Sequence, residues 1–169
     1  MLRLIIMRHA KSSWASPGKK DFDRELNERG REDLIKVSAK IHELGIRPEL
    51  VLCSSATRTR ETLSRIIDAF DPNPKIEYID ALYSGGMDDY LSVIGAVKDA
   101  SSVMIVGHNP MSGTLANKLS NSGDEAALNL IAMKYPTSAF SIIEFNISDW
   151  SKISNGHGNL IDCIIPSKL

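Results

Sequence analysis

Short apolar runs recur along the chain, and each ends abruptly at polar residues. The first run, Leu2–Met7, stops at an arginine followed by a histidine. Two further runs also end at polar residues: Leu50–Cys53 is followed by two serines, and Val103–Val106 by a glycine and a histidine. Short apolar runs with polar ends are typical of buried strands that deliver side chains to the edge of a sheet. We therefore predict strands at these three positions.

The stretches between these runs carry apolar residues at the spacing of amphipathic helices. Gly45 provides a C-terminal stop for the first of them, and Gly85 and Gly86 form a turn before the third. The predicted helices cover Leu34–Leu44, Leu63–Phe70, Tyr90–Val97 and Met111–Leu119. Further strands are predicted at Lys75–Ile79, Ser138–Phe145 and Asn159–Ile165, and loops at Lys11–Lys20 and Ser120–Asp124.

This order of elements predicts a three-layer α/β/α sandwich with a mostly parallel central sheet. The two late strands lack an obvious intervening helix, so we expect them to pair antiparallel at one side of the sheet. No internal repeat, low-complexity segment or linker interrupts the pattern. We therefore expect residues 1–169 to form a single domain.

Composition places the chain among ordinary globular proteins. Of its 169 residues, 43% are apolar and 24% are charged, and the formal net charge is -1. This balance gives no general attraction to nucleic acid or to an anionic membrane, so an anion site needs a local cluster of basic residues. No apolar stretch is long enough to span a bilayer, and the N-terminal run is too short for a signal peptide. We predict a cytoplasmic protein.

Four residues near the predicted strand ends carry the candidate chemistry. Arg8 and His9 follow the first run, Arg58 follows the second and His108 follows the third. A guanidinium offers a planar fork of donors that suits the oxygens of phosphate or sulfate. An imidazole titrates near neutral pH, and its neutral nitrogen can attack phosphorus to give a phosphohistidine intermediate.

Each of these residues also has a plainer interpretation. Arg58 could be one solvated charge on a helix with other charged residues, and His9 and His108 could each be a satisfied histidine in a turn. The two histidines could also be read as metal ligands, but the neighbouring arginines would repel a cation. Four such residues at the ends of strands on one side of a sheet favour a shared anion site.

Several motifs together resemble the histidine phosphatase superfamily, and within it the small SixA-like phosphohistidine phosphatases. The resemblance covers nearly the whole chain. The segments that carry it are Met7–Ser12, Asp23–Leu26 with Gly30, Ser54–Thr62, Val106–Pro110 and Pro136–Phe140.

The resemblance implies a phosphoglycerate mutase-like fold and a phosphatase that uses no metal and no cofactor. It implies that His9 is the nucleophile, that Arg8 and Arg58 clamp the phosphoryl oxygens, and that His108 stabilises the transferring group. Further candidates for substrate binding are Ser12, Arg24 and Asn109. We expect a phosphate or sulfate ion to be able to occupy this site.

One departure from the family pattern bears on the substrate. Many members carry a glutamate as general acid where this chain reads Leu82–Gly86, without that acid. An alkoxide leaving group needs a proton, and general acid catalysis is typically worth roughly 10²–10⁴-fold. A phosphohistidine substrate depends less on such an acid, because its imidazole leaving group is far less basic. One of Asp80, Asp88 and Asp89 could still supply the proton.

We therefore expect the substrate to be a protein that carries phosphohistidine. A broader phosphomonoesterase acting on small phosphorylated molecules is the alternative enzyme, and a phosphate-binding module without turnover is the alternative from another class. No nucleic-acid or membrane partner is expected.

Overall fold

The computed structural model describes residues 1–14, 16–154 and 156–169. Ala15, within the predicted loop Lys11–Lys20, and Asn155 lie outside the described residues. The strands are β1 (Leu2–Arg8), β2 (Leu50–Ser54), β3 (Lys75–Ile79), β4 (Ser102–Gly107), β5 (Ser120–Gly123), β6 (Phe140–Phe145) and β7 (Gly158–Ile164). The α-helices are α1 (Glu28–Leu44), α2 (Thr57–Ile66), α3 (Ala81–Ser84), α4 (Met87–Gly95), α5 (Met111–Leu119) and α6 (Glu125–Met133). Short 3-10 helices are η1 (Asp21–Asp23), η2 (Ile67–Ala69), η3 (Trp150–Lys152) and η4 (Pro166–Lys168).

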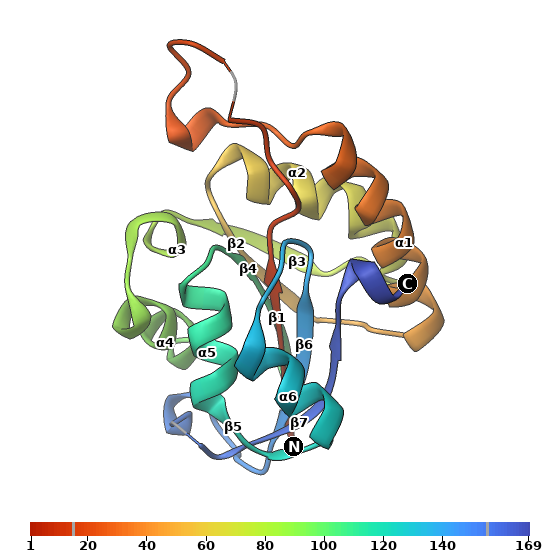
Figure 1. The fold of residues 1–169 in the computed structure, drawn as a ribbon. Coiled ribbons are helices and arrows are strands. Elements are labelled where there is room, and N and C mark those ends of the chain that lie inside the picture. Colours follow the sequence, from red (N-terminus) through yellow and green to blue (C-terminus); the bar gives the residue numbers. More distant parts are fainter. Residues whose placement is uncertain (15, 155) are drawn as a thin grey trace.

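The strands form one sheet in the order β3-β2-β4-β1-β6-β7-β5 (Figure 1). Strand β1 pairs in parallel with β4, β4 with β2, and β2 with β3. Strand β6 runs antiparallel to both β1 and β7, while β5 is parallel to β7. The predicted α/β fold with a mostly parallel sheet is confirmed, and so is the antiparallel pairing of the two late strands.

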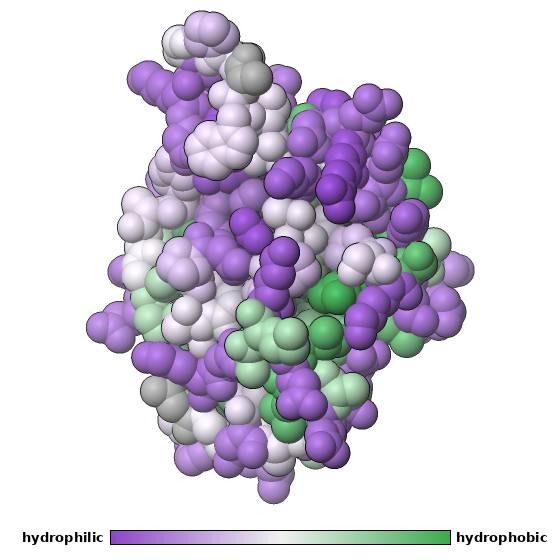
Figure 2. All heavy atoms as spheres, viewed as in Figure 1, coloured by the Kyte–Doolittle hydropathy of each residue, from purple (hydrophilic) through white to green (hydrophobic). Residues whose placement is uncertain are grey.

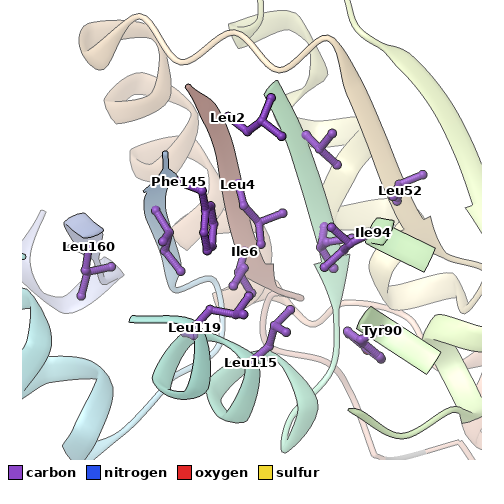
Figure 3. Close-up of a cluster of buried hydrophobic side chains, with 14 of the residues drawn as sticks. Leu2, Leu4, Ile6, Leu52, Tyr90, Ile94, Leu115, Leu119, Phe145 and Leu160 are labelled. Atoms are coloured by element: carbon purple, nitrogen blue, oxygen red, sulfur yellow. The ribbon is translucent and has the colours of Figure 1, made fainter. Parts of the chain in front are cut away.

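Helices cover both faces of the sheet because its inner strands are apolar on both sides. Along β1, Leu4 and Ile6 belong to the buried cluster beneath α4, α5 and α6, whereas Ile5 and Met7 belong to the cluster beneath α1 and α2. This alternation follows from the two-residue repeat of a strand. Figure 3 shows Leu4 and Ile6 packed with side chains of α5 and β6. The two clusters fix the three layers.

Helix α1 shows how local sequence sets the bounds of an element. The side chain of Asn27 accepts a hydrogen bond from the Gly30 amide and caps the first turn, and Gly45 ends the helix in a left-handed conformation with φ 62°. The helix begins before the apolar stripe, within the charged segment that precedes Leu34. Among the helices that the structure describes, none has both the length and the apolar character needed to cross a membrane.

The prediction of a loop over Ser120–Asp124 is wrong. Ser120–Gly123 forms the edge strand β5, and the helix α6 follows it in a stretch for which the sequence pattern gave no prediction. Gly123 has φ 137°, and a Cβ atom there would lie 2.1 Å from the carbonyl oxygen of Leu160 on β7. The close pairing of β5 with β7 needs a glycine at this position, and this glycine gives Ser120–Asp124 the composition of a turn.

Replacing Leu4 by alanine should lower the free energy of unfolding by about 2–5 kcal/mol, because its side chain is fully buried at the centre of the sheet. Ile35→Ala on α1 is the matched control, because Ile35 is 73% exposed. It should change the stability by less than about 0.5 kcal/mol. Urea unfolding measures both changes, and equal losses would contradict the assigned core.

Candidate active site

The parallel pairing of β1 with β4 brings the two predicted histidines together. Arg8 lies opposite Gly107 in the register, and the His9 amide donates a hydrogen bond of 3.0 Å to the Gly107 carbonyl. The next residue on each strand is therefore a histidine, and the ring centroids of His9 and His108 lie 5.3 Å apart. Both rings lie at the carboxyl edge of the sheet, where open α/β folds bind ligands.

The imidazole of His9 is held in one tautomer. Its Nδ1 lies 2.7 Å from the carbonyl oxygen of Ala10, so Nδ1 carries the proton. The Ala10 amide in turn donates to the Thr62 hydroxyl at 3.0 Å, which ties this turn to α2. Nε2 is left without a proton, on a side chain that lines the cavity at the edge of the sheet.

Burial is the main cause that lowers the pKa of His9 to about 3. The hydrogen bond to Ala10 opposes this shift, and the charges of His108, Arg58 and Arg8 add to it. The ring is therefore neutral near pH 7. A neutral imidazole with a fixed Nδ1 proton and a free Nε2 lone pair has the form that a nitrogen nucleophile requires.

His108 is also neutral near pH 7, and it contacts a residue that sequence reasoning missed. Its Nε2 lies 2.7 Å from the hydroxyl of Ser54, the last residue of β2. Burial is the main cause that lowers the pKa of His108 to about 4, followed by the charge of Arg58. The Ser54 oxygen also accepts a weak bond of 3.4 Å from the Ala56 amide, which leaves its own proton for Nε2. The position of Ser54 at the end of the neighbouring strand was the available signal.

A second missed residue, Tyr135, positions Arg8. The Arg8 guanidinium donates to the Tyr135 carbonyl at 3.1 Å, and the side-chain amide of Asn109 donates to the same oxygen at 2.8 Å. The buried Tyr135 hydroxyl donates to the carbonyl of Ile6 on β1 at 2.6 Å. Tyr135 therefore joins Arg8 and Asn109 to the central strand, although it precedes β6 by five residues.

Arg58 is held by Asp21, the third residue that sequence reasoning missed. The Arg58 guanidinium donates to the Asp21 carbonyl at 2.8 Å and to its carboxylate at 3.1 Å. Arg24 and the Tyr83 hydroxyl donate to the same carboxylate at 2.7 Å and 2.8 Å. Partial burial alone would raise the pKa of Asp21, but the bonds from Arg24 and Tyr83 and the charge of Arg58 lower it to about 2. Asp21 therefore stays ionised.

Arg24 and Ser12, two predicted substrate-binding residues, contact each other. The Arg24 guanidinium donates to the Ser12 hydroxyl at 2.6 Å and to the carbonyl of Ser13 at 3.1 Å. Together with its bond to Asp21, these contacts let Arg24 link the two parts of the segment between β1 and α1. The Ser12 hydroxyl keeps its own proton available for a ligand.

All the predicted site residues line one cavity, which we call the active cavity. It measures about 310 Å³. Four lining residues are cationic and one is anionic, so the cavity favours an anion. Its walls are formed by Arg8, His9, Lys11, Ser12, Trp14, Asp21, Arg24, Arg58, His108, Asn109 and Thr137.

The three aspartates considered as a general acid do not line the active cavity. Asp80 accepts a hydrogen bond from the Ser55 hydroxyl, and Asp89 accepts one of 2.9 Å from the Gly86 amide at the start of α4. Asp88 lies beside a separate hollow between α4 and η3. Among the residues that the structure describes, Asp21 is the carboxylate that lines the active cavity.

Comparison with known proteins agrees with this geometry. A family model of the histidine phosphatase superfamily (branch 1) matches residues 4–83. A protein of Mycobacterium tuberculosis is 32% identical over 164 residues, which cover 95% of this chain and 99% of that protein. A chloroplastic protein of Arabidopsis thaliana is 38% identical over 63% of this chain, and the match spans about half (54%) of the Arabidopsis protein.

Among solved structures, the SixA protein of Agrobacterium tumefaciens is 33% identical, with a TM-score of 0.79 and coverage of 98% of each chain. The sheet, the paired histidines and the cationic cavity define a histidine phosphatase. The chain belongs to the histidine phosphatase superfamily, and its sequence and structure are similar to those of the SixA protein.

Protonation of His9 in the unfolded chain should make the protein less stable in mild acid. Its pKa is about 3 in the folded protein, against an ordinary value of 6.5. Between these values the unfolded chain binds more protons, so the free energy of unfolding falls as the pH decreases. From pH 7 to pH 5 His9 should account for a loss of about 2 kcal/mol.

Urea unfolding of the native chain and of His9→Asn at both pH values measures this linkage. The loss between pH 7 and pH 5 should be about 2 kcal/mol smaller in the variant, since the His108 part remains in both proteins. Nitrogen NMR of the native chain should show a proton on Nδ1 of His9 at both pH values. An imidazole signal from His9 that titrates near pH 6.5 would contradict the neutral nucleophile.

Proposed function

We propose that this histidine phosphatase removes the phosphoryl group from phosphohistidine on a protein, through a covalent phospho-His9 intermediate and without a metal. The observation that carries the proposal is the state of His9. Its ring is neutral, its Nδ1 donates a hydrogen bond to the carbonyl of Ala10, and its side chain lines a cavity together with Arg8 and Arg58.

The proposed reaction has two displacements at phosphorus. In the first, the Nε2 lone pair of His9 forms a bond to phosphorus, while the bond from phosphorus to the substrate imidazole breaks and its electron pair goes to that imidazole nitrogen. The leaving nitrogen takes up a proton from solvent. In the second, a water oxygen attacks phospho-His9, which releases inorganic phosphate and a proton and restores the Nε2 lone pair.

The surrounding donors suit the phosphoryl oxygens. Arg8 and Arg58 supply positive charge, and they are fixed before substrate binds by Tyr135 and Asp21. Nε of Arg8 and Nδ1 of His108 are buried and have no hydrogen-bond partner in the described part of the chain. Phosphoryl oxygens in the active cavity would give both groups an acceptor.

The carboxylate in the active cavity supports phosphohistidine over a phosphate ester. Because its pKa is about 2, Asp21 holds no proton for an alkoxide leaving group near pH 7. An imidazole leaves without that help. The SixA protein of Agrobacterium tumefaciens is itself described as a candidate phosphohistidine phosphatase, which supports the same substrate class.

Phosphate release should be strongly selective for phosphohistidine over phosphoserine. The substrates are two peptides that differ at one position. One has a single histidine there, phosphorylated by treatment with phosphoramidate, and the other has phosphoserine. Both are assayed with a chelator present, using the native chain and His9→Ala. The native chain should favour the phosphohistidine peptide by at least roughly 10²-fold, because general acid help is absent. His9→Ala should be inactive.

Each other result has a distinct meaning. Equal or faster release from phosphoserine would require a proton donor and would favour the broader phosphomonoesterase. Phosphate binding without release from either peptide would favour the binding module. Loss of activity in the chelator would contradict the metal-free mechanism.

Substituting either arginine should reduce the rate more than it reduces stability. Arg8→Ala and Arg58→Ala should each lower kcat/KM on the phosphohistidine peptide by roughly 10²–10³-fold, because each removes a preorganised charge from the transition state. Arg65→Ala is the control, because Arg65 lies exposed on the same helix as Arg58. It should change the rate less than twofold. Losses below tenfold in both arginine variants would contradict the assigned clamp.

A further inference from the structure

A second hollow, which we call the flanking cavity, adjoins the active cavity. It measures about 420 Å³, and the segment between β1 and α1 forms most of its walls together with the first turn of α1. Trp14, Asp21 and Arg24 line both hollows. In Figure 1 this red to orange segment projects beyond the carboxyl edge of the sheet. A ligand bound in the active cavity can therefore continue past these three side chains into the flanking cavity.

Trp14 presents an aromatic surface at the junction of the two hollows. Its side chain is 80% exposed, and the guanidinium carbon of Arg24 lies 3.6 Å from the centre of its ring. Arg24 is held in place by its bonds to Ser12, Ser13 and Asp21, so one face of the indole packs against a fixed cation. The other face is open to solvent. A fixed and exposed tryptophan of this kind is typical of the anchor residues of protein interfaces.

The flanking cavity also contains a cation that is available to a ligand. Lys19 pairs with Glu25 at 3.5 Å, but Arg31 has no hydrogen-bond or ion-pair partner for its guanidinium among residues 1–14, 16–154 and 156–169. Arg31 is half-buried on the first turn of α1. A guanidinium in this setting pairs well with a carboxylate. Figure 2 shows that the projecting segment is hydrophilic to neutral, whereas the most apolar residues on this face lie lower down.

We propose that the flanking cavity binds the polypeptide next to the phosphohistidine, with Trp14 as its contact surface and Arg31 paired to a carboxylate of that polypeptide. This inference rests on the proposed function, since it names how that substrate is recognised. The active cavity takes the phosphoryl group and imidazole, and the main chain of a protein substrate can leave past the shared wall into the flanking cavity. A small phosphate would fill the active cavity alone.

Kinetics on matched substrates test this recognition. Three substrates are compared: N-acetyl phosphohistidine methylamide, ten-residue phosphohistidine peptides with one glutamate two to five residues before or after the phosphohistidine, and the same peptides with glutamine. The native chain should prefer one glutamate peptide over its glutamine partner about tenfold in kcat/KM. Arg31→Gln should abolish that preference through KM and leave turnover of the small amide within twofold.

Matched variants separate this recognition from general effects. Arg29→Gln lies exposed on α1 away from the flanking cavity and should leave every substrate unchanged. Arg31→Lys should restore part of the preference for glutamate, because it restores the charge. Trp14→Ala should lower kcat/KM about tenfold more on the peptides than on the small amide, whereas Met133→Ala, at an 85% exposed site on α6, should not.

The outcomes distinguish this inference from the function on which it rests. No release from the small amide or the peptides overturns the proposed function, and this inference falls with it. Release from all substrates, with the same ratio of peptide to amide in the native chain, Arg31→Gln and Trp14→Ala, overturns the flanking cavity alone. Equal losses on the amide and the peptides also overturn it, because Trp14 and Arg31 would then support the active cavity or the fold.

Discussion

The parallel pairing of β1 with β4 is the constraint on which the active site depends. It sets Arg8 opposite Gly107, so the first residue beyond each strand is a histidine at the same level of the sheet. Neither histidine needs a long loop to reach the other. The His9 amide donates to the Gly107 carbonyl on β4, and the His108 amide donates to the Tyr90 hydroxyl on α4. The resulting separation of 5.3 Å between the rings follows from the register and not from a flexible approach.

Charge balance at the cavity depends on Asp21. Arg58 and Arg24 both bond to its carboxylate, so two cations that would repel each other are held at fixed positions beside the active cavity. The bound carboxylate remains ionised because those same cations depress its pKa. Asp21 therefore orders Arg58, one of the two arginines of the proposed clamp, and among the described residues it leaves the cavity without a carboxylic acid. This links the geometry of the site to its expected preference for leaving groups that need no proton donor.

Sequence pattern predicted the central strands, the flanking helices and the four residues Arg8, His9, Arg58 and His108, because each follows a regular repeat or a strand end. It did not predict β5. Gly123 allows this strand to pair closely with β7, but in the sequence the same glycine indicates a turn. The pattern also missed Ser54, Tyr135 and Asp21. Their bonds to His108, Arg8 and Arg58 join residues between 37 and 127 positions apart, and such contacts exist only after the sheet is assembled.

Burial and positive charge act together on His9. A histidine beside two arginines in water would still titrate near neutral pH, but burial disfavours the imidazolium and the arginines add repulsion, so both causes keep the ring neutral. The same arginines favour the negative charge of a phosphoryl group. The charges that keep a proton off the proposed nucleophile are therefore those proposed to bind the substrate. Removing either arginine would weaken both effects at once, which is why the proposed clamp and the proposed nucleophile form one unit.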